Sequence, residues 1–153
     1  MKEINLKEEY QKIKHKLPKF EEINEDFEIE FIKEKNFLLR QIRRRISEKI
    51  IFFCRIIEGL VYPTQQHIIT ATEVKAFSEE RKKEIEKIYK ELMYLERESL
   101  LLDVFPDDKK DAEFINNVFS YWKKIKKEMK EVVHVMKESW KKEYKSEKDN
   151  YFG

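Results

Sequence analysis

The scarcity of glycine and proline is the feature of this sequence that most limits the folds open to it. The 153 residues include only 2 Gly and 3 Pro, against average usages of roughly 7% and 5%. Folds built from β-strands need turn residues about every 8 to 12 positions, and this chain cannot supply them. We therefore expect few and long elements.

The chain has enough apolar side chains to form a folded core. Hydrophobic residues make up 41% and aromatic residues 13%, and a disordered chain of this charge content would have fewer aromatics. This length is typical of one domain, so we expect residues 1–153 to form a single domain. The charged residues then form its solvated surface. Their enrichment in Lys and Glu is typical of thermophilic proteins, although an AT-rich genome gives the same bias.

The first helix is predicted to begin at Asn5. The Asn5 side chain can cap the helix, and Glu8 occupies the matching position of a capping box. Apolar residues continue at helical spacing until Pro18, which ends the helix. The acidic residues 19–26 are predicted to be irregular. Apolar residues alternate over residues 27–31, which is typical of a short extended segment or of the approach to the next helix.

Three longer helices follow, over residues 33–60, 78–105 and 107–146. Their apolar residues recur at spacings of three and four, the pattern of helices that pack with a left-handed twist. The sequence thus predicts an all-α fold, a bundle of about four long, mostly antiparallel amphipathic helices. Residues 145–153 are predicted to be a frayed tail.

The connection over residues 62–77 is the longest one in the predicted bundle. It contains apolar residues and three threonines, so we expect a short helix capped by Thr72. Long ordered connections often carry function, which makes this segment a place to look for a site.

Recognised catalytic and metal-binding motifs are missing from the sequence. Its two glycines are Gly59 and Gly153, which excludes a Walker A loop, a Rossmann fingerprint and a G-x-S-x-G elbow. Cys54 is the single cysteine, and we expect it to be a small buried hydrophobic residue. Glu131 and His134 have the spacing of a di-iron helix, but no second such pair accompanies them. We therefore expect no metal, no cofactor and no enzymatic activity.

The sequence also bears on the compartment. One cysteine excludes a disulfide framework and favours an intracellular protein. Its apolar runs fall short of the roughly 20 residues that cross a bilayer, and its first residues lack the apolar segment of a secretory signal. We expect a cytoplasmic protein without membrane contact.

Basic residues gather on the helix predicted over residues 33–60, whose net charge is +5. Guanidinium groups bind phosphates through paired hydrogen bonds, so the densest cluster is a candidate contact for an anion or a nucleic acid. It consists of Arg40, Arg43, Arg44, Arg45 and Lys49. The interpretation that we favour is that these cations pair with an acidic segment such as residues 61–108, net −4, or with a partner helix.

The last predicted helix reaches beyond the others. About 39 residues at 1.5 Å each give roughly 58 Å, against about 40 Å for the two helices before it. Interfaces favour Trp, Tyr and Met, and the candidate interface residues on this helix are Trp122, Met129, Met136, Trp140 and Tyr144.

These features favour a non-enzymatic interaction or scaffold protein. We expect it to self-associate, for example as a homodimer, or to dock on a helical partner protein. The alternative is a nucleic-acid-associated protein that contacts phosphates through the basic face of the second helix.

Overall fold

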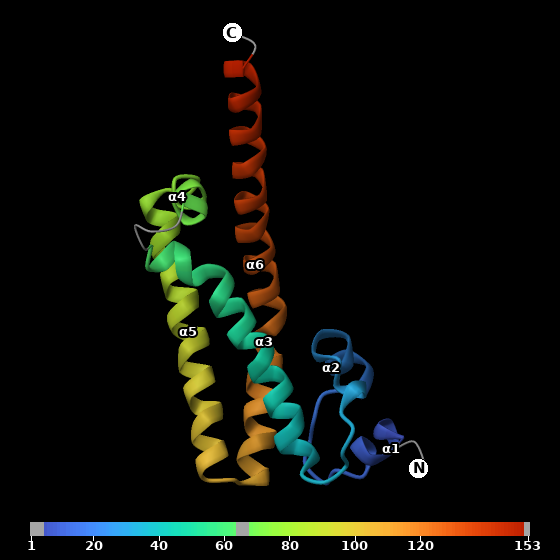
Figure 1. Ribbon diagram of the computed structural model, residues 1–153. Coiled ribbons are helices and arrows are strands. Elements are labelled where there is room, and N and C mark those ends of the chain that lie inside the picture. The colour runs from blue at the N-terminus through green and yellow to red at the C-terminus, as the bar shows by residue number, and fades with distance from the viewer. Residues whose placement is uncertain (1–4, 64–67, 152–153) are drawn as a thin grey trace. The chain divides into compact units, whose positions relative to one another are not determined.

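The computed structural model describes residues 5–63 and 68–151, which form helices and their connections without a β-strand (Figure 1). The all-α prediction is confirmed. The helices α3, α5 and α6 have 24, 26 and 44 residues, and none of the described helices is long and apolar enough to cross a membrane. The element order is α1 (Leu6–Gln11), α2 (Phe20–Phe27), the 3₁₀ helix η1 (Ile29–Phe31), α3 (Leu38–Val61), α4 (Ile68–Val74), α5 (Glu79–Val104) and α6 (Asp108–Tyr151).

The chain divides into two compact units. The first unit lies within residues 1–52 and 93–123, and the second lies within residues 53–92 and 124–153. Three helices, α3, α5 and α6, contribute to both units. Each unit is described separately below.

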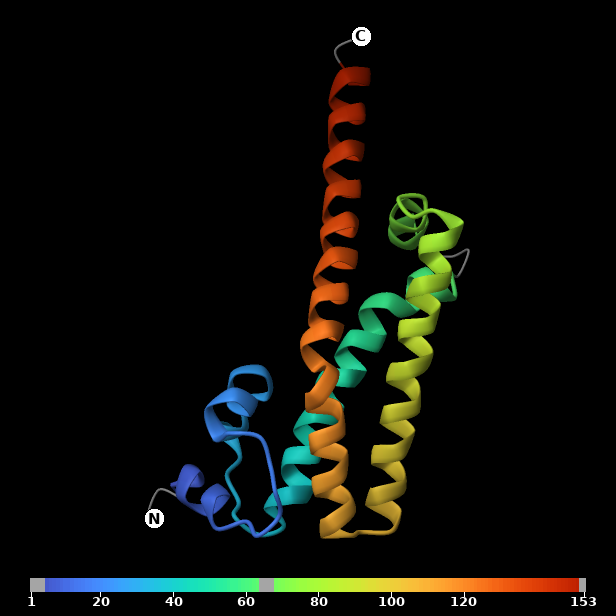
Figure 2. The same ribbon diagram turned by 180° about the vertical axis from the view of Figure 1, so that it is seen from behind.

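The first unit contains α1, α2, η1, the start of α3, the end of α5 and the start of α6. In both views the end of α5 and the start of α6 run antiparallel, side by side (Figures 1 and 2). The rings of Phe27 and Trp122 pack with centroids 4.9 Å apart. Burial of such side chains is the main stabilising contribution. The buried core of this unit includes Ile23, Phe27, Ile29, Ile42, Ile46, Ile50, Leu95, Leu102, Phe114, Ile115, Val118 and Trp122.

The first helix starts as predicted but ends early. The backbone N–H of Glu8 donates to Oδ1 of Asn5 at 3.4 Å, and Nδ2 of Asn5 donates to Oε1 of Glu8 at 2.8 Å. These two bonds confirm the capping box. The helix α1 nevertheless ends at Gln11, because the chain turns so that the Tyr10 hydroxyl donates to the carbonyl oxygen of Pro18 at 2.6 Å. The predicted continuation to Pro18 is wrong.

The acidic segment after Pro18 is helical, contrary to the prediction. The buried side chains of Ile23 and Phe27 lie four residues apart and give α2 an apolar face. Glu28 then takes a left-handed conformation with a φ of 51° and ends α2. The residues that follow form the 3₁₀ helix η1 instead of an extended segment.

The helices α5 and α6 both begin at a side-chain cap, close to the predicted starts. Oγ of Ser78 accepts a hydrogen bond from the N–H of Arg81 at 3.1 Å, and Oδ1 of Asp107 accepts one from the N–H of Lys110 at 3.0 Å. Both are N-caps that satisfy backbone donors at the helix start. At the other end, residues 145–151, predicted as a frayed tail, belong to α6.

The second unit contains the end of α3, α4, the start of α5 and the rest of α6. The indole N–H of Trp140 donates to Glu73 of α4 at 3.2 Å. Thr72, predicted to cap a short helix, lies inside α4, and residues 64–67 of this connection lie outside the described residues. The buried side chains of this unit include Phe53, Cys54, Ile57, Leu60, Phe77, Ile85, Ile88, Leu92, Ile125, Met129 and Val132.

Candidate functional site

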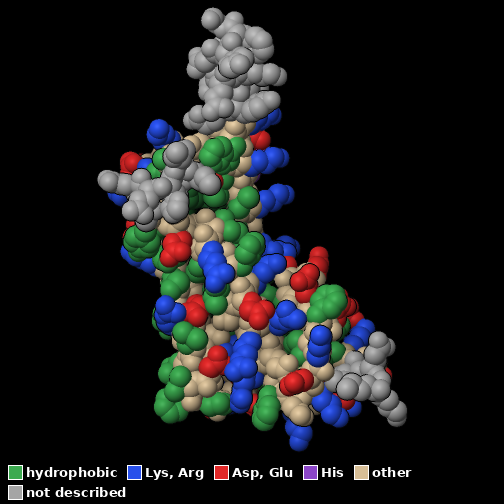
Figure 3. All heavy atoms as spheres, in the orientation of Figure 1, with side chains coloured by type: hydrophobic (Ala, Val, Ile, Leu, Met, Phe, Trp, Pro, Cys, Tyr) green, Lys and Arg blue, Asp and Glu red, His purple; other side chains and the backbone are tan. Residues whose placement is uncertain are grey.

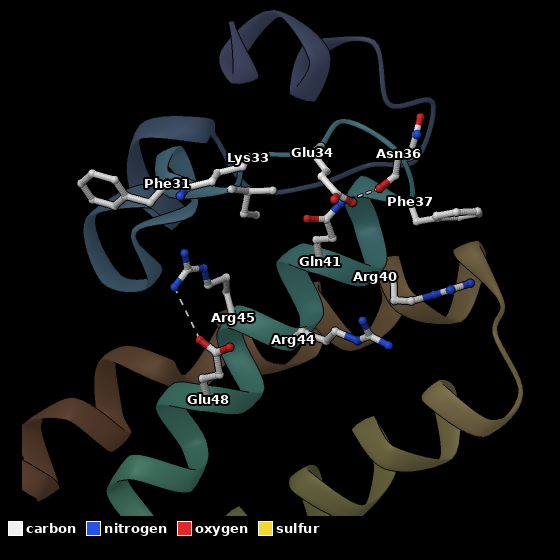
Figure 4. A pocket seen from close by; sticks show the side chains of 11 residues that line it. Phe31, Lys33, Glu34, Asn36, Phe37, Arg40, Gln41, Arg44, Arg45 and Glu48 are labelled. Carbon is white, nitrogen blue, oxygen red and sulfur yellow. Dashed lines mark hydrogen bonds and ion pairs between the residues drawn. The ribbon is translucent and has the colours of Figure 1, made fainter. Parts of the chain in front are cut away.

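A hollow of about 510 Å³ lies in the first unit, between the η1–α3 connection and the start of α3 (Figure 4). We refer to it as the basic hollow because four of its lining side chains are cations and two are carboxylates. Its lining residues are Phe31, Ile32, Lys33, Glu34, Asn36, Phe37, Arg40, Gln41, Arg44, Arg45 and Glu48.

Gln41 fixes the connection that forms one wall of the basic hollow. Its Nε2 donates to the carbonyl oxygens of Glu34 at 3.0 Å and of Asn36 at 2.5 Å. Its backbone N–H donates to the carbonyl oxygen of Phe37 at 3.1 Å. Phe37 has a φ of 55°, a left-handed conformation that is rare for an aromatic residue and costs about 1–3 kcal/mol. The helix α3 therefore begins at Leu38, five residues later than predicted.

Two phenylalanine rings at the basic hollow are exposed. Phe31 is 61% and Phe37 67% exposed, and they lie at opposite ends of the hollow in Figure 4. The guanidinium carbon of Arg40 lies 4.7 Å from the centroid of the Phe37 ring, which is a cation–π contact. The buried Nε of Arg40 has no hydrogen-bond partner.

Two further arginines of the basic hollow form weak ion pairs. Nε of Arg44 donates to Oδ1 of Asp103 at 3.1 Å, and Nη1 of Arg45 lies 3.5 Å from Oε2 of Glu48. In each pair one side chain is more than half exposed and the other about a third exposed, and pairs open to solvent contribute about 0–1 kcal/mol. Lys49, the remaining candidate of the predicted cluster, is half-buried and does not line the hollow.

Arg43 is fully buried, and the prediction that it shares an exposed basic face is wrong. Its Nε donates to Asp111 at 2.5 Å and its Nη2 to Asp103 at 2.5 Å. Its Nη1 donates to the carbonyl and hydroxyl oxygens of Ser99 at 2.8 and 2.7 Å. We name Arg43, Ser99, Asp103 and Asp111 the buried arginine cluster. It supports the favoured interpretation for Arg43, a charge match within the chain.

The two aspartates of the buried arginine cluster have opposite pKa shifts. Burial raises the pKa of Asp111, against the lowering effect of the hydrogen bond from Arg43. Burial also acts to raise the pKa of Asp103, but hydrogen bonds from Arg43 and Arg44 outweigh it and the pKa is lowered. Buried charges need such partners to remain ionised. The cluster therefore acts as a structural clamp between α3, the end of α5 and the start of α6.

The end of α5 exposes a row of large apolar side chains in the first unit. Tyr94, Leu101 and Phe105 are 72%, 59% and 71% exposed, and spacings of seven and four place them on one side of the helix. Hydrophobic side chains gather over the end of α5 in Figure 3. We name this surface the α5 apolar face, made of Tyr94, Leu100, Leu101, Val104 and Phe105.

A second hollow of about 550 Å³ adjoins the α5 apolar face. Apolar side chains of α5 and α6 meet polar ones there, as in many grooves that accept a partner side chain. Its lining residues are Glu98, Leu101, Leu102, Phe105, Lys110, Glu113, Phe114 and Asn117.

The candidate interface residues on α6 differ widely in exposure. Trp122 and Met129 are 1% and 3% exposed, so they pack inside the chain and offer little surface to a partner. Met136 is half-buried, Trp140 is 39% exposed, and the side chain of Tyr144 lies outside the described residues. The largest exposed apolar group of the first unit is on α5 instead.

A metal site or a relationship to a known protein would each indicate a function. Across the described residues, no group of three His, Cys, Asp or Glu side chains is placed to hold a metal ion. No family model, curated protein or solved structure matches the chain. Its function is therefore inferred from its own exposed surfaces.

Proposed function

We propose that this chain is a non-enzymatic interaction protein that pairs with a second copy of itself through the α5 apolar face. The observation that carries the proposal is a group of five large apolar side chains at the end of α5 and just after it, with exposures from 45% to 72%. Contiguous apolar patches of more than a few hundred Å² are rare on monomers and mark interaction sites.

The size of the α5 apolar face suits a modest homodimer. With about 150–250 Å² for a fully covered aromatic side chain, the five residues present roughly 600 Å². Two copies would then bury about 1,200 Å², the lower end of the standard interface size. Weak and transient complexes lie at this end of the size range, and we expect a dissociation constant of about 10⁻⁶ to 10⁻⁵ M.

The charges around the α5 apolar face favour a second copy over a strongly charged partner. Charged residues of both signs lie beside it: Glu98, Lys110 and Glu113 line the adjoining hollow, and the exposed Arg97 lies on α5 between Tyr94 and Leu101. Self-pairing by a two-fold axis brings the same surface together twice. Because charges of both signs lie beside this face, such pairing avoids the repulsion that a patch of one sign would create.

Sedimentation equilibrium of the full chain and two variants tests the proposal. Leu101→Lys places a charge at the centre of the α5 apolar face, and Val133→Lys makes the same kind of change at a 41% exposed residue of α6. We expect the wild type and Val133→Lys to dimerise and Leu101→Lys to remain monomeric with an unchanged circular dichroism spectrum. A monomeric wild type over a hundredfold range around about 10 µM, or equal dimerisation of all three proteins, would overturn it.

A further inference from the structure

We infer that the basic hollow is a binding site for single-stranded nucleic acid, separate from the α5 apolar face. Single-strand binders combine aromatic side chains, on which bases stack, with cations that follow the phosphates. The basic hollow has both, with Phe31 and Phe37 as rings and Lys33, Arg40, Arg44 and Arg45 as cations.

The Phe37 ring is exposed on a strained backbone. A phenylalanine gains free energy by leaving water, yet this one is 67% exposed and has a left-handed backbone. Gln41 holds the connection before it in place through hydrogen bonds to Glu34 and Asn36. Strained residues fixed in this way are frequent at ligand-binding positions. The ring is thus displayed at the rim before any ligand arrives.

The cations of the basic hollow are available to contact phosphates. Within the lining of the basic hollow they exceed the carboxylates by two. Arg44 and Arg45 are held in partly exposed ion pairs, which a phosphate can replace through charge-assisted hydrogen bonds. Arg40 has an unpartnered Nε and lies against the Phe37 ring. Lys33 is exposed and completes the set.

The arrangement of rings and cations distinguishes a strand from a free nucleotide or a duplex. Phe31 and Phe37 lie at opposite ends of the hollow, with Arg44 and Arg45 between them in the view of Figure 4. Bases stacked on both rings would place the intervening phosphates near these arginines. A single nucleotide has only one base for the two rings, and the bases of a duplex are already stacked on each other. Stacking on phenylalanine reads no base edge, so we expect little sequence preference.

Fluorescence anisotropy with labelled oligo(dT) and oligo(U) of about ten nucleotides tests the inference on the full chain. Phe37→Ala and Phe31→Ala should each weaken binding by about fivefold to a hundredfold. Arg44→Gln should lower the slope of log K against log salt by about 0.7. The control is Arg55→Gln, an exposed arginine of α3 that does not line the hollow, and it should bind as the wild type does.

Three further binding measurements distinguish this site from nonspecific attraction between charges and from the proposed dimer contact. A duplex of equal length and free UMP should both bind at least tenfold more weakly than the single strand. Leu101→Lys, which removes the proposed dimer contact, should bind the strand as a folded monomer. The inference is overturned if low salt gives no binding, if the phenylalanine variants match the wild type, or if duplex binds as tightly as single strand.

Discussion

Arg43 and Arg44 stand side by side on α3 and both contact Asp103, yet we expect their replacement by alanine to have very different effects. The Arg43 side chain is fully buried and makes four hydrogen bonds. The Arg44 side chain is 55% exposed. Arg43→Ala and Arg44→Ala therefore compare the loss of a buried charge with the loss of an exposed one at neighbouring positions.

The expected magnitude follows from what each substitution leaves behind. Without Arg43, Asp111 stays 1% exposed with no cation, and the loss of one member of a buried ion pair costs about 3–5 kcal/mol. Without Arg44, Asp103 keeps its bond to Arg43, and an exposed pair contributes at most about 1 kcal/mol. At about 2–4 °C per kcal/mol for a chain of this length, Arg43→Ala should lower Tm by roughly 6–20 °C.

Urea and thermal unfolding followed by circular dichroism at neutral pH measure both effects. A double variant, Arg43→Met with Asp111→Leu, removes the two buried charges together and should recover part of the lost stability, because apolar replacement of a whole buried pair is often neutral. Equal losses for Arg43→Ala and Arg44→Ala would refute the reasoning, since the buried arginine cluster would then not stabilise the first unit.

Three further predictions concern pH, packing and thiol reactivity. The pKa of Asp103 is lower in the folded chain, so its stabilisation is complete above its unfolded pKa of about 3.9 and is lost as pH falls through the folded value. The stability difference between wild type and Asp103→Asn should thus shrink in urea titrations below about pH 4, and a constant difference would contradict this. Trp122→Ala should cost about 3–5 kcal/mol because the ring is buried against Phe27, and a loss below about 1 kcal/mol in the same assay would show that the site is loosely packed. The Cys54 thiol is 6% exposed and should react with a thiol reagent far more slowly in the native chain than in urea, whereas equal rates would place it at the surface.

Local signals in the sequence were sufficient for the fold class and for several helix starts. Scarce glycine and proline and apolar spacings of three and four predicted the all-α fold, which the structure confirms. Asn5 was predicted as a cap because a cap is a contact between residues three positions apart. The predicted helix starts at residues 78 and 107 coincide with the caps Ser78 and Asp107. The shortening of α1 could not be foreseen, because it depends on the turn that joins Tyr10 to Pro18.

The buried arginine cluster shows what a periodic pattern omits. Arg43 lies four residues after Leu39 and three before Ile46, which is a core position on α3. A charged side chain at such a position is a signal of an internal partner. Its partners Asp103 and Asp111 are 60 and 68 residues away, and only the packing of the helices brings them together.

The candidate surfaces were predicted in part. Three arginines of the basic hollow come from the predicted basic cluster, whereas the exposure of Phe31 and Phe37 depends on the conformation of the η1–α3 connection. The α5 apolar face was missed because α5 has apolar residues on more than one side, and the spacing alone does not say which side neighbours cover. Leu95 and Leu102 are buried while Tyr94 and Leu101 beside them are exposed.

Cross-linking through an introduced cysteine tests most directly whether two copies meet at the α5 apolar face. A residue at the centre of a two-fold interface lies close to its own copy, so Leu101→Cys should form covalent dimers with a short bismaleimide. Wild type, with Cys54 buried, and Val133→Cys serve as controls and should remain monomeric on a denaturing gel. Dimers from Leu101→Cys alone are the predicted result, and no cross-linked dimer, or equal yields from Leu101→Cys and Val133→Cys, would contradict the proposed function.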